Sequence, residues 1–267
     1  MPAAGKPTAN RYLAIIEKIF FDRYKPGDTE VAFRRIDLEL AAEELRVALP
    51  KNLGDVLYSV RYRMALPQRV LDTQPGDREW IIEGIGRSKY AFRLVSRTRI
   101  RPSEALATIA IPDATPEMIR AYALDDEQAL LAIVRYNRLI DTFLGLTAFS
   151  LQNHLRTAVN GVQIEIDELY VGLDKFGCHY VIPVQAKGGT DQIGVVQTSQ
   201  DVRYVEHKFP ELRSRPIAAQ FMTDGIVAMF ELTIQDGQVK IVDERHYKLV
   251  PASQLNEVEI SAYRKVT

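Results

Sequence analysis

The chain has 267 residues, of which 46% are hydrophobic, and this length and apolar content suit one large or two modest globular domains. No apolar run approaches the roughly 18 residues of a membrane span, and the first residues lack the apolar core of a secretory signal, so we expect a cytoplasmic protein without a membrane partner. The single cysteine, Cys178, excludes an internal disulfide and a cysteine-based zinc site.

The formal net charge of −1 conceals an uneven distribution along the chain. Residues 1–101 contain 19 Lys and Arg against 13 Asp and Glu, whereas residues 102–267 contain 15 against 22. A basic N-terminal part favours a polyanionic partner such as DNA. The acidic remainder is compatible with a plain solvated surface, and also with a site that collects carboxylates around a metal ion.

Apolar spacing in the N-terminal part predicts three helices and a short strand. The expected helices are residues 11–24, 37–45 and 52–62, and the strand is residues 31–35. A helix, a short turn and a helix with a polar, basic face are typical of a helix-turn-helix. The side chains offered to DNA by this last helix and its ends are Lys51, Asn52, Tyr58, Arg61 and Arg63.

Two further strands are expected at residues 79–83 and 90–95, joined by a glycine-rich connection that carries Arg87 and Lys89. This hairpin resembles the wing of a winged-helix domain. The resemblance implies a DNA-binding domain over residues 1–100, with its helix in the major groove and its wing along the phosphates. The alternative is a small α/β module whose charged helix face is only solvated.

The second part of the chain, residues 105–267, alternates helical and strand patterns. Residues 127–144 and 149–159 predict helices, and Asn160-Gly161 predicts a turn into a pair of strands. A further helix is expected to run towards His207, followed by apolar strands at residues 217–222, 226–234, 239–242 and 247–250. The expected fold class is therefore α/β or α+β with a mixed sheet flanked by helices.

The pair of strands spans Gln163 to Gly189 and carries the polar residues of greatest interest. Period-2 geometry places Glu165 and Asp167 on one face of the first strand. The same rule places Gln185 and Lys187 together near the end of the second strand. If the hairpin closes, an acid, an amide oxygen and an ammonium group converge, and this set can hold a divalent cation and activate a water molecule. An exposed sheet edge with ordinary charges is the alternative.

This stretch resembles the PD-(D/E)xK nuclease superfamily. Gln185-Ala186-Lys187 is similar to the Gln-x-Lys variant of Mrr-like restriction endonucleases, and Asp167 stands where the family has its metal-binding aspartate. Ile166 replaces the proline that precedes this aspartate in the family pattern. The resemblance implies a restriction-endonuclease-like core over residues 105–267 and a requirement for Mg²⁺ or Mn²⁺.

The resemblance also implies roles for individual residues. Asp167, Gln185 and Lys187 are the expected catalytic set, with Lys187 orienting or activating the attacking water. The expected metal ligands are Asp167, Gln185, the carbonyl of Ala186 and, on the same strand face, Glu165. Gln200 and Tyr204 are similar to a Q-x-x-x-Y element of RecB-type members and are secondary candidates.

Together these patterns predict a Mg²⁺-dependent endonuclease that cleaves double-stranded DNA, resembles a type II restriction enzyme and, by inference from the family, acts as a homodimer. One alternative is a DNA-binding regulator with an inactive nuclease-like core, which the glutamine in place of an acid leaves open. Another is a nuclease without sequence specificity that acts in repair or junction cleavage.

Overall fold

The structure is a computed structural model and describes residues 8–50, 52–62, 64–96, 100–122, 127–188, 193–235, 237–255 and 257–264. The chain divides into two compact units. The N-terminal unit comprises Met1–Arg97 with Ala158–Gln163, and the C-terminal unit comprises Thr98–Thr157 with Ile164–Thr267.

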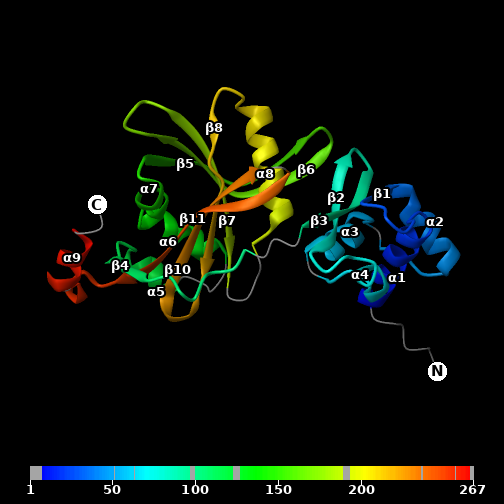
Figure 1. Cartoon of the computed structure of the whole chain (residues 1–267), viewed down its shortest axis with the longest axis horizontal. Helices are drawn as coiled ribbons and strands as arrows, with labels where there is room; N and C mark the ends of the chain where they lie inside the picture. Colours follow the sequence, from blue (N-terminus) through cyan, green and yellow to red (C-terminus); the bar gives the residue numbers. More distant parts are fainter. Residues whose placement is uncertain are drawn as a thin grey trace. The chain divides into compact units, whose positions relative to one another are not determined.

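The N-terminal unit combines helices with a small antiparallel sheet (Figure 1). Its elements are α1 (Thr8–Phe21), β1 (Glu30–Arg34), α2 (Arg35–Leu45), α3 (Gly54–Tyr62), α4 (Gln68–Leu71), β2 (Arg78–Gly86) and β3 (Lys89–Ser96). The strand order is β1-β3-β2, and both pairings are antiparallel. The helices, the first strand and the final hairpin predicted from the sequence are therefore present in the predicted chain order.

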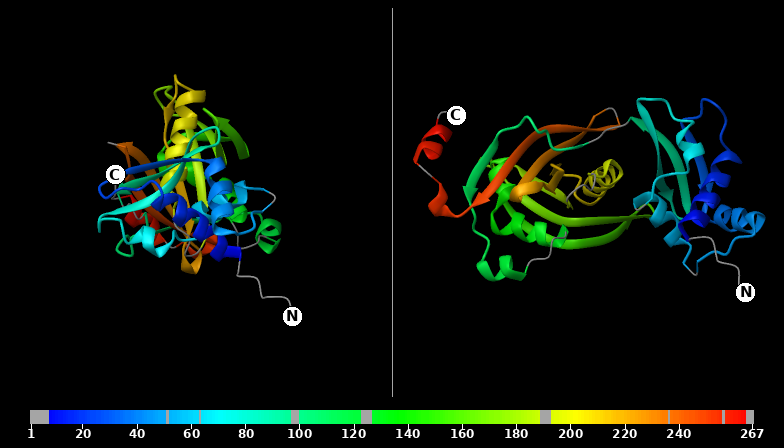
Figure 2. Two further views of the ribbon diagram at one scale, coloured as in Figure 1. Left: turned by 90° about the vertical axis from the view of Figure 1, so that its right-hand side faces the viewer. Right: turned by 90° about the horizontal axis from the view of Figure 1, so that it is seen from below.

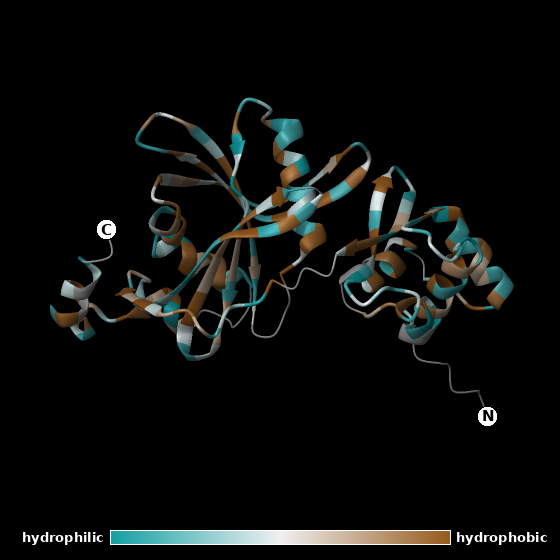
Figure 3. Cartoon of the chain, viewed as in Figure 1, coloured by the Kyte–Doolittle hydropathy of each residue, from teal (hydrophilic) through white to brown (hydrophobic). Residues whose placement is uncertain are grey.

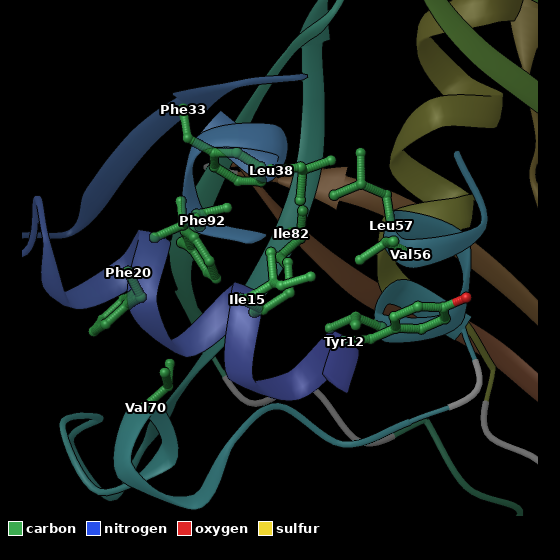
Figure 4. Close-up of a cluster of buried hydrophobic side chains, with 14 of the residues drawn as sticks. Tyr12, Ile15, Phe20, Phe33, Leu38, Val56, Leu57, Val70, Ile82 and Phe92 are labelled. Atoms are coloured by element: carbon green, nitrogen blue, oxygen red, sulfur yellow. The ribbon is translucent and has the colours of Figure 1, made fainter. Parts of the chain in front are cut away.

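A single aromatic-rich core holds this unit together (Figure 4). Apolar residues recur in α1 at helical spacing, so one face of the helix is buried against the sheet. Phe20 lies on this face, and its ring centroid is 5.1 Å from that of Phe92 on β3 and 5.2 Å from that of Trp80 on β2. The rings meet edge to face, the arrangement that aromatic quadrupoles favour.

The C-terminal unit is built on a larger, mixed sheet. Its elements are β4 (Thr108–Pro112), α5 (Glu117–Tyr122), α6 (Glu127–Tyr136), α7 (Leu139–Leu144), β5 (Thr147–Val159), β6 (Val162–Leu173), β7 (His179–Lys187), α8 (Val195–Lys208), β8 (Arg213–Ser214), β9 (Ile217–Phe221), η1 (Thr223–Gly225), β10 (Ile226–Gln235), β11 (Gln238–Val250), η2 (Ala252–Gln254) and α9 (Glu257–Tyr263). Among the described residues, eight strands form this sheet in the order β4-β11-β10-β9-β7-β6-β5, with β8 beside β7.

The sheet contains both parallel and antiparallel pairings, and the connections between strands decide which occurs. β6 and β7 form an antiparallel hairpin, whereas β7 and β9 are parallel because α8 crosses between them. β9, β10 and β11 are antiparallel neighbours, and β4 pairs with β11 in parallel. The chain is thus an α+β protein with a mixed sheet, as the sequence predicts at this level.

Helices cover both faces of the central strands. Leu130 and Leu131 of α6 pack with Ile182, Val184 and Ala186 on one face of β7. On the other face α8 approaches β7, and the sheet curves around this helix in the right-hand view of Figure 2. Figure 3 shows that hydrophobic segments occur on the strands and on the helices that pack on them. In the part of the chain that the structure describes, every helix is too short or too polar to span a bilayer.

The helix predicted at residues 149–159 is wrong, because this segment forms strand β5 at the edge of the sheet. Asn160 and Gly161 both have positive φ, 51° and 78°, which is the two-residue hairpin turn that matches strand twist. This turn pairs β5 with β6, and the backbone hydrogen bonds of the sheet outweigh the local helical pattern.

The helix predicted over residues 127–144 is divided into α6 and α7. Arg138 has φ 49° and cannot continue the first helix. Asn137 anchors the break, since its amide nitrogen donates to Thr115 Oγ1 at 2.8 Å and its carbonyl oxygen accepts from the Ala114 amide at 2.7 Å. These contacts join segments that are far apart in the sequence, so the local spacing of apolar residues does not predict them.

Replacing Phe20 with Ala should lower the free energy of unfolding by about 3–5 kcal/mol, because the change leaves a cavity among aromatic neighbours. Urea unfolding can be followed by the fluorescence of Trp80, the only tryptophan in the sequence, which lies in the same core. Leu40 on α2 is 51% exposed, so Leu40→Ala should cost less than about 0.5 kcal/mol and serves as the control. A Phe20→Ala protein as stable as the wild type would contradict this packing.

Candidate active site

The predicted hairpin is confirmed as strands β6 and β7, which pair from Leu173 and His179 at the turn to Glu168 and Val184. The turn between them is stabilised by Asp174, whose Oδ1 accepts from the amides of Phe176 at 2.8 Å and Cys178 at 3.0 Å. Beyond the last paired residues, β6 continues back through Asp167 and β7 continues forward to Lys187. The polar residues of interest therefore lie at the end of the hairpin remote from its turn.

Asp167 is held against the backbone of β7. Its Oδ2 accepts a hydrogen bond from the Ala186 amide at 3.0 Å and a longer one from Gln197 Nε2 of α8 at 3.5 Å. Burial raises the pKa of Asp167 above its ordinary value, while the Ala186 amide and the Lys187 charge oppose the rise. Asp167 is thus fixed in position and partly withdrawn from water, with both of its hydrogen bonds in the described chain on one oxygen.

Lys187 extends from the end of β7 to the first residue of α6. Its Nζ donates to Glu127 Oε1 at 2.7 Å, and the side chain of Lys187 is 18% exposed while that of Glu127 is 41% exposed. The Lys187 and Glu127 charges both act on Asp167, in opposite directions. An ammonium group and two carboxylates therefore gather at one end of the sheet, supplied by β7, α6 and β6.

Gln185 has a different role in the structure from that of a free oxygen ligand. Its Oε1 accepts from the Gly194 amide at 3.0 Å, and its Nε2 donates to Thr198 Oγ1 at 2.6 Å. Thr198 Oγ1 in turn donates to the Gly194 carbonyl at 3.1 Å. Gln185 is 1% exposed and joins β7 to the first turn of α8, so its amide oxygen is already engaged.

Glu165 does not join Asp167. Its Oε1 lies 3.1 Å from Arg156 Nη2 and 3.3 Å from His154 Nε2, both on β5, and its side chain is 43% exposed. Its neighbour Glu168 is fully buried and accepts from Arg135 Nε at 2.9 Å and Ser150 Oγ at 2.5 Å. Neither glutamate therefore adds a carboxylate to the group around Asp167.

Gln200 and Tyr204 are both buried on α8, at 5% and 8% exposure, and Tyr204 packs edge-on against Phe209. In the part of the chain described, neither makes a hydrogen bond with Asp167, Gln185 or Lys187. The α8 residues that do approach the hairpin are Gln197, Thr198 and, by its charge, Asp201.

Asp201 was not foreseen from the sequence. It is 2% exposed, and its charge interacts with those of Asp167 and Lys187. A signal exists in the pattern of α8, because Thr198, Asp201, Val202 and Val205 recur at the spacing of a buried stripe and are all buried. An acid in such a stripe, one turn from two polar residues that bond to the hairpin, marks a buried polar site.

The donor set fits a cation that retains much of its water. Among the described residues, no three of His, Cys, Asp or Glu gather closely enough to form a metal-binding group. Mg²⁺ is commonly held by only one or two carboxylates together with several waters. Asp167 suits this role, since its Oδ1 makes no hydrogen bond in the described chain, whereas the amide of Gln185 is engaged elsewhere.

A basic cavity lies in the N-terminal unit, at the turn between β2 and β3. Its volume is about 470 Å³, and it is lined by Arg34, Arg35, Ile36, Arg87, Ser88 and Lys89. None of its four cations has an ion-pair partner among the described residues, whereas Lys18, Arg23, Arg69 and Arg93 of the same unit are all paired. Arg34 and Arg35 join the predicted Arg87 and Lys89 because β1 lies beside β3.

The structure describes only part of the predicted helix surface. Lys51 and Arg63 lie outside the described residues, as do the side chains of Tyr58 and Arg61. Asn52 is exposed and caps α3, since its Oδ1 accepts from the Gly54 amide at 3.1 Å and its Nδ2 donates to Asp55 at 2.9 Å. Gly189, at the end of the hairpin stretch, also lies outside the described residues.

Comparisons of the chain with protein-family models, with curated proteins and with solved structures found no match.

Asp201→Asn should raise the free energy of unfolding near neutral pH by about 1–3 kcal/mol, since it removes a buried carboxylate. Burial, with Asp167 nearby, raises the pKa of Asp201 well above 3.8, so the folded state holds this proton more tightly than the unfolded chain. The wild type therefore loses stability relative to the variant as the pH rises from about 4. Urea unfolding in a chelator at several pH values measures this difference, with exposed Glu206→Gln on the same helix as the control. An equal difference at every pH would exclude the explanation.

Proposed function

We propose that this chain is a Mg²⁺- or Mn²⁺-dependent endonuclease that hydrolyses phosphodiester bonds in double-stranded DNA, in the manner of a type II restriction enzyme. The observation that carries the proposal is the convergence of Asp167, Lys187 and Glu127 at the end of the β6–β7 hairpin. A carboxylate fixed by the backbone and an ammonium group beside it are the minimum that metal-assisted phosphodiester hydrolysis needs.

Each residue of this set has a defined task. Asp167 would hold the cation, which supplies polarisation of the phosphate and a water of lowered pKa when bound. The Ala186 amide keeps the Asp167 carboxylate oriented. Lys187 would stabilise the negative charge that develops on the phosphate, and Glu127 holds its ammonium group in place. Gln185 fixes α8 against the hairpin, and this role takes the place of the ligand role that the resemblance implies.

The N-terminal unit would bind the DNA. Its order of helix, strand, two main helices and a hairpin supports a winged-helix-like module, with Arg87 and Lys89 at the tip of the wing. The unpaired cations around the basic cavity are suited to a backbone phosphate. The proposed groove contacts remain those named from the sequence, Lys51, Asn52, Tyr58, Arg61 and Arg63. Action as a homodimer on a two-fold symmetric site belongs to the same proposal.

A second candidate is a DNA-binding regulator whose nuclease-like core does not cut. The observation that favours it is the engaged amide of Gln185, which leaves Asp167 as the one carboxylate of the predicted set that faces the site. Incubation of plasmid DNA with protein and Mg²⁺ separates the two candidates. Discrete fragments support the endonuclease, smeared products support a nuclease without sequence specificity, and a gel shift without cutting supports the regulator.

Asp167→Ala and Lys187→Ala should each fold and bind DNA, yet lose cleavage by about 100-fold or more, because each removes a group that acts on the reacting phosphate. Plasmid cleavage with Mg²⁺ is the measurement, and a gel shift in Ca²⁺ checks binding. Glu165→Ala is the matched control, since Glu165 pairs with Arg156 and His154 and should keep wild-type cleavage. If both variants retained cleavage, the assignment of Asp167 and Lys187 to the active site would be wrong.

Replacing Arg87 and Lys89 together with Ala, or Arg34 and Arg35 together, should weaken DNA binding at every sequence. The slope of log K against log salt concentration should become shallower by about 0.9 for each phosphate that the variant no longer neutralises. Fluorescence anisotropy with a labelled duplex at several salt concentrations measures both effects. Lys25 and Arg78 are exposed and do not line the cavity, so their double Ala variant has the same charge change and is the control. Equal slopes in all proteins would show that the cavity does not hold phosphate.

A further inference from the structure

Asp201 is a buried acid that has no hydrogen-bond or ion-pair partner among the described residues. The residue is 2% exposed, and Oδ1 is shielded from solvent without a hydrogen-bond donor in the described chain. An isolated carboxylate in such a place is costly, and proteins retain one when it is paired, protonated or bound to a cation.

The side chain of Asp201 lies on the side of α8 that meets the hairpin. Gln197, one turn earlier, reaches Asp167 Oδ2 at 3.5 Å, and Thr198, three residues earlier, bonds Gln185 at 2.6 Å. Residues three and four positions apart share a helix face, so Asp201 continues the face that contacts β6 and β7. Its charge accordingly interacts with Asp167 and Lys187, two members of the candidate site.

Lys187 does not neutralise this pair of acids on its own. Its ammonium group is bound to Glu127 at 2.7 Å, so one cation is shared among three carboxylates of α6, β6 and α8. Asp167 and Asp201 repel each other electrostatically. A further positive charge between them would offset both burial and repulsion, and a hard, oxygen-preferring divalent ion is the ligand that two carboxylates and water favour.

We propose that Asp201 supplies a second carboxylate to the divalent-cation site at Asp167, in the position that the predicted Gln185 and Glu165 do not fill. The identity of the cation rests on the proposed nuclease function, but the site itself does not require that the protein cut DNA. Asp167 Oδ1 on β6 and Asp201 Oδ1 on α8 each make no hydrogen bond within the described chain. The two carboxylates give Mg²⁺ or Mn²⁺ its protein ligands and leave its other positions to water and phosphate.

Calorimetric titration of Mn²⁺ into the chelator-treated full chain tests the proposal. The wild type should bind Mn²⁺, and Asp201→Asn should weaken this binding by about 10-fold or more. Glu206→Gln removes the same charge from an exposed position of α8 and should bind as the wild type does. Wild-type affinity in Asp201→Asn, or no Mn²⁺ binding by the wild type, overturns the proposal.

A double variant shows whether the two acids share one ion. If they do, Asp167→Asn with Asp201→Asn should bind little more weakly than Asp167→Asn alone, whereas separate sites would leave each single variant with one Mn²⁺ site of wild-type affinity. A site of wild-type affinity that persists in either single variant overturns the shared site. Urea unfolding without metal shows that each variant is folded. If Mn²⁺ binding depends on Asp201 but the wild type does not cleave plasmid DNA, the cation site is supported and the nuclease function is contradicted. If the wild type cleaves plasmid DNA but Asp201→Asn binds Mn²⁺ as tightly as the wild type, the nuclease function is supported and the role of Asp201 is contradicted.

Discussion

The pairing of β6 with β7 is the constraint on which the candidate site depends. The ladder from the turn to Glu168 and Val184 sets the register, and the register decides that Asp167 meets the backbone of Ala186. A shift of one residue would send Asp167 to the face covered by α6, where Ile182 and Val184 pack. The register of the sheet therefore determines where Asp167 lies relative to Lys187.

Gln185 shows how the same hairpin also positions its covering helix. Its amide satisfies the Gly194 amide and the Thr198 hydroxyl at once, in a place with almost no access to water. A buried polar group with both ends bonded is stabilising, whereas a hydrophobic replacement would leave the Gly194 amide without this acceptor and remove one of the two hydrogen bonds of Thr198 Oγ1. The face of α8 with Gln197 and Asp201 is thereby directed at Asp167. The glutamine that resembles a ligand in the sequence acts here as a connection between sheet and helix.

The features that the sequence predicts correctly are those with local physical determinants. The alternation of β6, the apolar run of β7 and the turn at Asp174 predict the hairpin without knowledge of any other segment. The helix predicted for the segment of β5 was wrong, because pairing with β6 overrides the local pattern of that segment. Asp201 was also missed, since the approach of one turn of α8 to the end of β6 depends on how the helix packs. The spacing of residues shows which of them share a face of a helix, but only the packed structure shows which neighbouring element that face contacts.

Charge in this chain is arranged so that each unit has an excess that its own fold does not neutralise. In the C-terminal unit, the charges of Glu127, Asp167 and Asp201 lie near the ammonium group of Lys187, so the excess is negative, and Asp201 is buried while Asp167 is partly buried. In the N-terminal unit, four cations without ion pairs in the described chain line one cavity, and the excess is positive and accessible. Burying charge of one sign costs free energy, so the first excess favours a small cation and the second a polyanion. The proposed nuclease would use the first for its metal ion and the second for the phosphates of its substrate.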